Sequence, residues 1–274
     1  MRLSLVIPSY NQAAFLETCL RSALEQAHPD LEVLVMDGGS TDGSREIIER
    51  HAGQLAYWQS QPDGGQAAAI NAGMALATGD ILTWLNSDDF LLPGALSLVR
   101  EVFTRWPQVR WLTGRPANAD AEGRLAEIGP ATGRFRALIR RGWYHGRGLG
   151  FIRQEGTFWR RTLWEQAGGQ VSEHFQQAMD FDLWRRFAAH ADLVTVDSIL
   201  AAFRFQPNQK TADSAYYYHE AGVRVPAWLR PVILPCRALF TLASWPFAPR
   251  IVYRRAAPGR PAGWELKGMM NDER

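Results

Sequence analysis

The 274-residue sequence has little cysteine and little net charge. Its two cysteines, Cys19 and Cys236, lie far apart in apolar surroundings. This argues against a disulfide framework or a zinc site and fits a reducing compartment. The net charge of +2 argues against a general nucleic-acid-binding protein. No internal repeat or low-complexity tract is present, so the length favours one α/β core with elaborations.

Neither end of the chain offers an uninterrupted hydrophobic run of membrane-spanning length. The N-terminal MRLSLVIPSYN is too short for a signal peptide and ends in a turn sequence, so it predicts a first strand and a cytoplasmic protein. Apolar residues, in contrast, make up 46% of the chain, including eleven tryptophans. This is enough for a large core.

Short apolar runs alternate with helical patterns through the first half of the chain. Strands are expected at 3–7, 31–36, 55–59 and 81–85, with helices between them and Asn11 as the N-cap of the first helix. Later, we expect a helix at 93–106, a strand at 109–113, a hairpin at 116–128 and a strand-like TFWRR followed by a helix within 157–191. The alternation predicts an α/β fold with a mostly parallel sheet flanked by helices.

The chain is organised around residues 81–90, ILTWLNSDDF. Asp88 and Asp89 follow a buried strand, and ligands of open α/β sheets collect at such carboxyl ends. Two adjacent carboxylates need a cation or hydrogen-bond donors to stay ionised, and a hard divalent cation is the usual answer. The alternative is that Asn-Ser-Asp-Asp merely caps the helix expected to begin near Pro93.

Two later segments are rich in arginine. Residues 131–150 mix arginines with His145, glycines and Trp143-Tyr144, and predict a mobile basic loop or short helix over the site. The arginines of that segment are Arg134, Arg136, Arg140, Arg141 and Arg147. Residues 221–264 contain seven arginines and no acidic residue, interrupted by prolines that disfavour a transmembrane helix.

These features predict a division of the chain at residue 220. Residues 1–220 would form the catalytic domain, and residues 221–274 a basic, Trp/Pro-rich amphipathic extension. Through residues 224–260 the extension would lie on the inner face of the cell membrane as a peripheral contact. The alternatives are an extension packed on the catalytic core and a homodimer contact.

Five motifs in order carry a resemblance to a known family. VIPSYNQAAFL, VLVMDGGSTDGS, PDGGQAAAINAG, GDILTWLNSDD and MDFDLW resemble those of the inverting family 2 glycosyltransferases of the GT-A fold, a Rossmann-like nucleotide-diphospho-sugar transferase fold. The likeness covers roughly residues 3–206. It implies a nucleotide-sugar donor and a divalent cation, Mn²⁺ or Mg²⁺.

The resemblance also implies which residues contact the donor. They are Pro8, Ser9, Tyr10, Asn11, Asp37, Gly65, Gln66, Asn71, Asn86, Asp88, Arg204 and Lys210. Asp37 would accept from the base imide N–H, and Gly64 and Gly65 would let the backbone approach the nucleotide. The metal is expected chiefly on Asp88, with Asp89 second. This sequence departs from the family at Gly38, where many members have a second Asp, at Asn86 in the D-x-D motif, and at Gln206, where many have His.

Inversion requires a carboxylate that accepts the proton of the attacking hydroxyl. The family usually supplies it from a Glu-Asp pair at a helix start; here Met179 replaces the Glu, Asp180 is the expected base and Asp182 the alternative. Positions i and i+2 face different sides of a helix, so only one can face the cleft. The competing interpretation is that Asp180 caps the helix and Asp182 pairs with Arg185 or Arg186. Residues expected at the acceptor are Gln154, Glu155, Gly156 and Thr157.

Together these features predict a metal-dependent inverting transfer of a sugar from a UDP- or dTDP-sugar to a glycan or lipid-linked acceptor, in cell-surface polysaccharide biosynthesis. Two other functions remain open. A nucleotidyltransferase would need a Gly-rich, Lys/Arg-bearing loop after the first strand, which PSYNQAAF lacks. A non-catalytic sugar-nucleotide-binding or scaffold protein would account for the departures at Gly38, Asn86, Met179 and Gln206.

Overall fold

The computed structural model describes residues 1–26, 28–206, 209, 214–222, 239–240, 243–257 and 261–269. Its first half alternates strands and helices: β1 (Leu3–Ser9), α1 (Ala13–Leu24), β2 (Leu31–Asp37), α2 (Ser44–His51), a 3₁₀ turn (Ala52–Gln54), β3 (Tyr57–Ser60), α3 (Gln66–Leu76) and β4 (Ile81–Trp84). The expected order of strands and helices is confirmed in this part of the chain.

The second half is less regular. It contains β5 (Phe90–Leu91), α4 (Ala95–Arg105), β6 (Trp111–Thr113), β7 (Ala117–Ala119), β8 (Leu125–Ile128), α5 (Arg136–Arg140), β9 (Thr157–Arg160), α6 (Arg161–Gln166), α7 (Met179–His190), β10 (Leu193–Val196), β11 (Ala201–Arg204), α8 (Ser214–Glu220), β12 (Arg250–Arg254) and β13 (Gly263–Lys267). The hairpin expected at 116–128 is β7 and β8.

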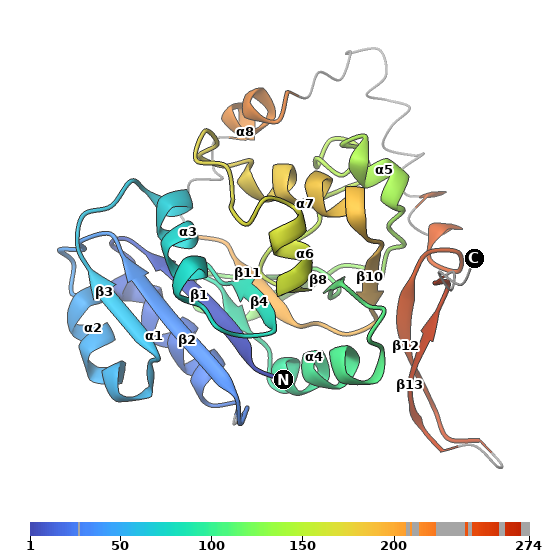
Figure 1. The fold of residues 1–274 in the computed structure, drawn as a ribbon, viewed down its shortest axis with the longest axis horizontal. Helices are drawn as coiled ribbons and strands as arrows, with labels where there is room; N and C mark the ends of the chain where they lie inside the picture. Colours follow the sequence, from blue (N-terminus) through green and yellow to red (C-terminus); the bar gives the residue numbers. More distant parts are fainter. Residues whose placement is uncertain are drawn as a thin grey trace.

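A nine-stranded sheet forms the centre of the molecule, in the order β13-β12-β10-β6-β9-β4-β1-β2-β3 (Figure 1). Its neighbouring strands are parallel except around β9 and at the β12–β13 edge. A smaller sheet has the order β5-β11-β7-β8. The predicted mostly parallel α/β fold is therefore confirmed, and the antiparallel strand β9 is the feature that the alternation of elements did not indicate.

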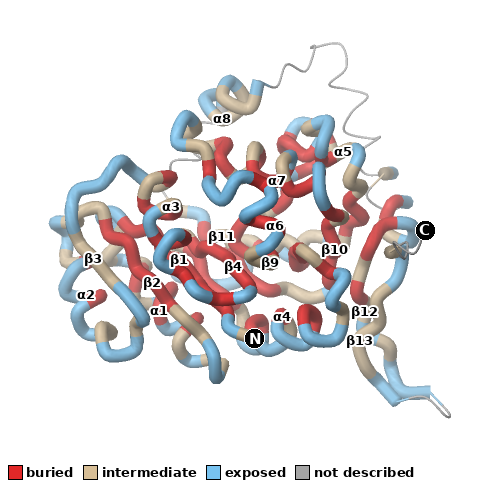
Figure 2. The backbone as a smooth tube through the Cα atoms, viewed as in Figure 1, coloured by how far each residue is buried: buried red, intermediate tan, exposed pale blue. Residues whose placement is uncertain are grey.

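Helices cover both faces of the large sheet because its strands are apolar on both sides. Along β1, Leu5 and Ile7 pack with residues of α1, α2 and α4, whereas Val6 packs with residues of α3, α6 and α7. Figure 2 shows the resulting continuous burial of β1, β2 and β4. Strands buried on both faces are expected of a parallel sheet covered by crossover helices.

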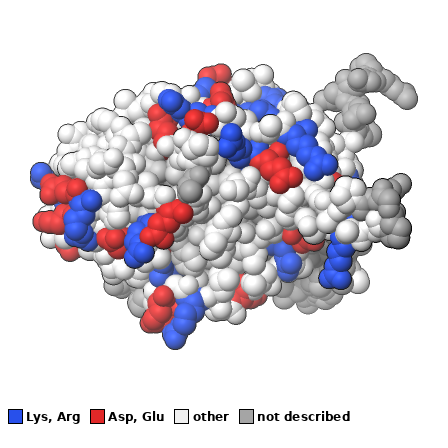
Figure 3. Space-filling model, turned by 90° about the horizontal axis from the view of Figure 1, so that it is seen from below, with Lys and Arg blue, Asp and Glu red and all other residues white. Residues whose placement is uncertain are grey.

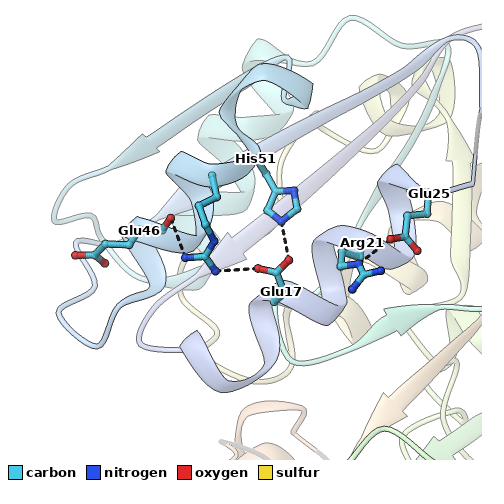
Figure 4. A network of polar contacts seen from close by, with 6 residues as sticks. Glu17, Arg21, Glu25, Glu46 and His51 are labelled. Carbon is cyan, nitrogen blue, oxygen red and sulfur yellow. Dashed lines mark hydrogen bonds and ion pairs between the residues drawn. The ribbon is translucent and has the colours of Figure 1, made fainter.

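Polar pairs join the helices on the outer surface. Glu17 on α1 accepts a hydrogen bond from Arg50 at 3.0 Å and lies 2.9 Å from a ring nitrogen of His51, both at the end of α2 (Figure 4). The His51 hydrogen bond holds the pKa of Glu17 below its ordinary value. On the face seen from below, acidic and basic side chains lie side by side (Figure 3). Such exposed pairs stabilise only slightly.

Part of the C-terminal extension belongs to the large sheet. β12 pairs in parallel with β10, and β13 pairs with β12. Trp264 and Leu266 pack against the core. The predicted boundary at residue 220 therefore does not separate two structural units, and the alternative of packing on the core holds for these strands. Arg224, Arg230, Arg237, Arg260 and Cys236 lie outside the described residues.

None of the helices in the described ranges combines the length and apolar composition that crossing a bilayer requires.

Of the two alternatives for the basic segment 131–150, the short helix is confirmed, because the segment contains α5 and is packed. Ile139 and Tyr144 are buried against α7 and its neighbours. Arg136 donates to the carbonyls of Ala188 and Ala189 at the end of α7, at 2.9 and 2.6 Å. Arg134 is buried, which lowers the pKa of its guanidinium to about 10. Arg134 and Arg136 therefore donate hydrogen bonds to backbone carbonyls of the packed core and do not extend over a site.

The abundance of tryptophan is explained by one cluster between the sheet and α7. Trp184 packs against Trp111, Trp159 and Trp84, with ring centroids 5.6, 5.8 and 6.1 Å apart. All four indoles are almost inaccessible to solvent. Large aromatic side chains at this depth dominate the apolar surface that a core removes from water.

We therefore expect Trp184→Ala to lower the free energy of unfolding by about 3–5 kcal/mol, because it leaves a large cavity inside this cluster. Chemical denaturation monitored by circular dichroism measures the loss. Trp143→Ala is the matched control, because Trp143 is 48% exposed, and it should change the same quantity by less than about 1 kcal/mol. Equal losses in the two variants would contradict the assignment of the core.

Candidate active site

The carboxyl ends of β1, β2 and β4 meet at one edge of the sheet. Ser9 pairs with Asp37 across β1 and β2, and Val6 pairs with Trp84 across β1 and β4. The loops that follow these strands therefore lie side by side, which brings Pro8, Ser9, Tyr10 and Asn11 next to Asp37 on one side and to the Asn86–Asp89 turn on the other. Most of the donor residues implied by the resemblance are on these loops.

Asp37 is fully buried, and its carboxylate is occupied by the protein. It accepts from the N–H groups of Gly39 and Ser40, at 3.2 and 2.9 Å, and from the Ser60 hydroxyl at 2.6 Å. Asp37 thus shapes the β2–α2 loop and joins it to β3. Because its oxygens already accept these hydrogen bonds, Asp37 shapes the wall of the pocket. The resemblance had implied a hydrogen bond from the nucleobase of the donor to this side chain.

The loops after β1 and β2 are tied together by side-chain hydrogen bonds. Asn11, with a φ of 51°, accepts from the N–H of Thr41 at 2.9 Å. The prediction that Asn11 caps the first helix is wrong: the N-cap is Gln12, and the N–H of Ala13 donates to Asp42 at 2.9 Å. The cap therefore comes from the neighbouring loop.

Two exposed or unpaired groups remain at this position. Tyr10 is 62% exposed, so its ring is available to a ligand. The buried Ser9 hydroxyl has no hydrogen-bond partner. Both fit the expectation of a pocket wall there.

The turn before α3 approaches the same edge. Gly65 has a φ of 96°, a conformation that favours glycine, and its N–H donates to Asp63 at 2.7 Å. Gln66 donates to Asn86 at 2.8 Å, which joins the start of α3 to the end of β4. A Cβ on Gly38 would lie 3.3 Å from an Asp63 oxygen. Sequence reasoning missed Asp63, whose carboxylate stands beside the glycine that replaces a second acid.

Asn71 has a different role from the one implied by the resemblance. It accepts from the N–H of Val171 at 2.9 Å and donates to its carbonyl and to Glu173, both at 3.0 Å. It therefore joins α3 to the loop before α7 and does not support the nucleotide turn.

Asp88 and Asp89 differ sharply in their surroundings. Asp88 accepts from the Gln206 side chain at 2.9 Å and is partly exposed. Asp89 is 1% exposed: one oxygen accepts from the N–H of Arg204 at 2.9 Å, and the other is buried without a partner. Burial, and then the charges of Asp88 and Glu155, raise the pKa of Asp89 well above its ordinary value. Asp89 faces the interior, so its prediction as a second metal ligand is corrected.

The alternative that this turn only caps the next helix is also wrong. α4 begins at Ala95, two residues later than expected from Pro93, and its N-cap is Gly94 with no side-chain hydrogen bond. The acidic side chains are thus free of a capping role.

Arg204 supports the Asp88–Asp89 turn from the interior of the protein. Its guanidinium lies between the rings of Phe15 and Phe90, 5.2 and 5.1 Å from their centroids, and donates to the Asp88 carbonyl at 2.7 Å. The side chain is 3% exposed. The structure thus gives Arg204 a supporting role in the turn, and the predicted donor contact stays a prediction. Lys210, predicted for the same task, lies outside the described residues.

The predicted acceptor residues divide into two pairs. Thr157 is buried in the sheet, where its hydroxyl bonds to Thr113 at 2.9 Å, and Gly156 packs against residues 200–201. Gln154 and Glu155 are buried too, but each carries a side-chain oxygen without a partner. Burial raises the pKa of Glu155, and the charge of Asp88 adds to this effect. Glu155 therefore belongs to the acidic cluster, and Thr157 belongs to the core.

Asp180 and Asp182 can now be distinguished. Asp182 forms an ion pair with Arg186 at 2.9 Å, on the side of α7 away from the cluster. Asp180 accepts from the N–H of Phe181 next to it, and no ion pair of Asp180 is found among the described residues. Burial, and then the charge of Glu155, raise its pKa to about 7. The geometry favours Asp180 as the base, and the competing interpretation holds for Asp182 alone.

The acidic cluster suits a divalent cation shared with a substrate. Among the side chains of the described ranges, no three His, Cys, Asp or Glu are arranged to hold a metal alone. Mg²⁺ and similar ions are commonly held by one or two carboxylates with water and substrate phosphates. Asp88, partly exposed at this edge, is the carboxylate available to such an ion, and Glu155 has a side-chain oxygen without a partner in the described part of the chain.

Removing the Asp180 charge should stabilise the protein at high pH. Its pKa is about 7 in the folded protein against an ordinary 3.8, so folding is opposed increasingly as pH rises from 3.8 to 7 and by a constant amount above. We expect Asp180→Asn to raise the free energy of unfolding at pH 8 by about 1 kcal/mol or more, and by less at pH 5.

Thermal unfolding at the two pH values measures this difference. Asp182→Asn is the control, because it loses an ion pair and should lower the melting temperature slightly at both pH values. A lower melting temperature for Asp180→Asn at pH 8 would show that its carboxylate is stabilised in the fold.

Comparisons with known proteins match the first half of the chain to glycosyltransferases. The model of the Glycosyl transferase family 2 matches residues 4–124. An uncharacterized glycosyltransferase of Nostoc is 39% identical over 106 residues, which cover 38% of this chain and 33% of that protein. A chondroitin synthase of Pasteurella multocida is 35% identical over 128 residues, covering 46% and 13%. The chain thus spans a third or less of the length of these two relatives.

Solved structures show the same fold over most of the chain. TarS residues 1–349 of S. aureus, in complex with UDP-GlcNAc, superposes with a TM-score of 0.60 at 16% identity, covering 88% of this chain and 66% of that one. The mannosyltransferase PcManGT of Pyrobaculum calidifontis, with GDP-Man and Mn²⁺, has a TM-score of 0.60 at 19% identity, covering 89% and 73%. The family model thus matches residues 4–124 of this chain, and the fold over most of the chain is the GT-A glycosyltransferase fold.

Proposed function

We propose that this protein is an inverting, hexosyltransferase-type glycosyltransferase, dependent on Mn²⁺ or Mg²⁺, that uses a nucleoside diphosphate sugar. The observation that carries the proposal is a cluster of carboxyl groups from three elements. Asp88 follows β4, Glu155 precedes β9, and Asp180 lies in the first turn of α7; the charge of Asp88 acts on Glu155, and that of Glu155 acts on Asp180. Carboxylates raise one another's pKa at sites where a proton or a cation is handled.

Asp180 would act as the general base. An acceptor hydroxyl that attacks the anomeric carbon gives its proton to the Asp180 carboxylate, and the bond from that carbon to the diphosphate breaks. A base with a pKa near 7 is well matched to this task at neutral pH. Attack on the face opposite the diphosphate inverts the anomeric configuration.

Asp88 would hold the divalent cation at the open edge of the sheet. When bound, the cation supplies charge neutralisation to the departing diphosphate. Gln206, already bonded to Asp88, keeps that carboxylate in place. Tyr10 and Ser9 would line the nucleoside side of the pocket, and Gly65 would let the backbone approach the diphosphate.

The donor we propose is a UDP- or dTDP-sugar, and the acceptor a glycan or lipid-linked glycan in cell-surface polysaccharide biosynthesis. UDP-GlcNAc in the S. aureus TarS structure and the name of the Pasteurella chondroitin synthase support this choice. Because the Pyrobaculum enzyme was solved with GDP-Man, guanosine diphosphate sugars should be tested as donors beside UDP- and dTDP-sugars.

Two substitutions test the chemistry. Asp180→Asn should bind the donor as the parent does and lose transfer by at least about 100-fold, because only proton acceptance is removed. Asp88→Ala should lose the part of donor affinity that depends on Mn²⁺. Calorimetry with nucleotide sugars, with and without metal, and a transfer assay measure both, and Asp182→Asn is the control expected to remain active.

In the parent enzyme, kcat/KM should fall as pH drops below about 7, since Asp180 is then protonated. Equal donor affinity of parent and Asp88→Ala in Mn²⁺ would contradict the metal assignment. A parent that neither transfers nor hydrolyses any donor would instead be a non-catalytic sugar-nucleotide-binding protein.

We further propose that residues 224–260 contact the inner face of the cell membrane. Residues 221–264 carry seven arginines and no acidic residue. Leu239 and Phe247 are 68% and 75% exposed, so apolar side chains are available beside this charge. Arginine beside exposed apolar residues suits a surface of anionic lipids.

Because β12 belongs to the sheet, substitution tests this proposal better than truncation. Phe247→Ser with Arg255→Glu should reduce binding to phosphatidylglycerol vesicles at least about fivefold, since each basic residue contributes ~1 kcal/mol. Co-sedimentation measures it. Arg45→Glu on α2, at the other end of the sheet, is the control expected to bind as the parent does. Unchanged binding of the double variant would refute the contact.

A further inference from the structure

The short helix α8 is attached to the start of α7 through a single carboxylate. Glu220, its last residue, accepts from the N–H groups of Gln176, Gln177 and Ala178 at 2.7, 2.8 and 3.1 Å. These are the three residues that precede α7. Burial alone would raise the pKa of Glu220, but the three N–H donors outweigh it and hold the pKa below its ordinary value. The contact is therefore made by an ionised carboxylate at neutral pH.

Two aromatic contacts hold α8 in the same position. The ring of Tyr217 packs edge-on against Phe151, with centroids 5.5 Å apart. The guanidinium of Arg147 lies over the ring of Tyr218, 3.6 Å from its centroid. A cation over an aromatic face at this distance is attractive. The helix is thus fixed from the 145–151 segment as well as from α7.

This attachment places the end of α8 near Asp180, which is two residues beyond Ala178. The charged groups that act on Asp180 are Glu155 and Arg153, from the segment before β9. On α8, burial and then the charge of Asp180 raise the pKa of Tyr217.

We propose that Glu220 is a positioning residue for the transfer reaction: by binding the three N–H groups before α7, it fixes the backbone from which Asp180 extends. The proposal rests on the assignment of Asp180 as base.

The physical basis is the directionality of these bonds. Hydrogen bonds to an ionised carboxylate are shorter and stronger than neutral ones, and a negative charge is favoured at a helix N-terminus. Three of them from consecutive residues leave the 176–178 backbone little freedom. A displacement of about 1 Å at a reacting group can lower the rate about 100-fold. Loosening the start of α7 should therefore lower the transfer rate without changing the contacts to the donor.

Glu220→Ala and Glu220→Gln test the proposal in the full-length protein. We expect Glu220→Ala to lower kcat about 10- to 100-fold with the donor KM within twofold of the parent, and the acidic limb of the pH profile to move below pH 7 as water reaches Asp180. Glu220→Gln keeps the side-chain shape and one acceptor oxygen, so it should restore part of kcat. Glu173→Gln is the control, because Glu173 lies in the same loop but accepts from Asn71 on α3 instead of from the N–H groups before α7.

Hydrogen exchange of the amides of residues 176–178 reads the attachment directly. They should exchange faster in Glu220→Ala than in the parent and be unchanged in Glu173→Gln. Faster exchange with an unchanged kcat and pH profile would overturn the positioning role. Unchanged exchange, or a loss confined to donor KM, would overturn it as well, as would the failure of both Glu220 variants to fold.

These outcomes separate the inference from the function on which it rests. If Asp180→Asn transfers sugar as the parent does, the base assignment fails, whatever Glu220 does. If Asp180→Asn is inactive and Glu220→Ala is as active as the parent, only the role of Glu220 fails.

Discussion

The site depends on carboxyl groups that are crowded where little water can reach them. Asp89 and Glu155 are 1% and 4% exposed, each with one oxygen lacking a partner, and Asp88 acts on both. Such a cluster is unfavourable to folding unless protons or a cation neutralise it. It persists here because the Trp-rich core and the parallel sheet hold its elements in place, and burial together with the repulsion raises the pKa values of Asp89, Glu155 and Asp180.

Several polar residues of the expected site have structural roles. Asp37 shapes a loop, Arg204 supports the Asp88–Asp89 turn between two phenylalanines, and Asn71 joins α3 to the loop before α7. Each is hydrogen-bonded to the backbone of a loop or turn, which it helps to position. Buried polar atoms without a hydrogen-bond partner indicate the position of the pocket more directly than charge does. Such atoms occur in Ser9, Gln154 and Glu155.

The parts of the prediction that succeeded were local. Alternating apolar runs indicated β1, β2 and β4, and polar residues after each strand indicated the site edge, because parallel strands end at the same side of a sheet. The packing of the 131–150 segment and of the β12–β13 edge was harder to predict, and for a common reason. Their arginines bind carbonyls and carboxylates distant in sequence, such as Arg136 with Ala188 and Arg254 with Glu265, and composition does not reveal such partners.

By itself, then, the sequence determined the order of strands and helices, the GT-A resemblance and the Asp88 turn, because these follow from periodicity and from residues adjacent in the chain. The choice of Asp180 over Asp182, the inward turn of Asp89 and the attachment of Glu220 to residues 176–178 were decided only by tertiary structure. The reason is physical: which face of α7 is buried, and what lies against it, depends on packing between elements far apart in sequence.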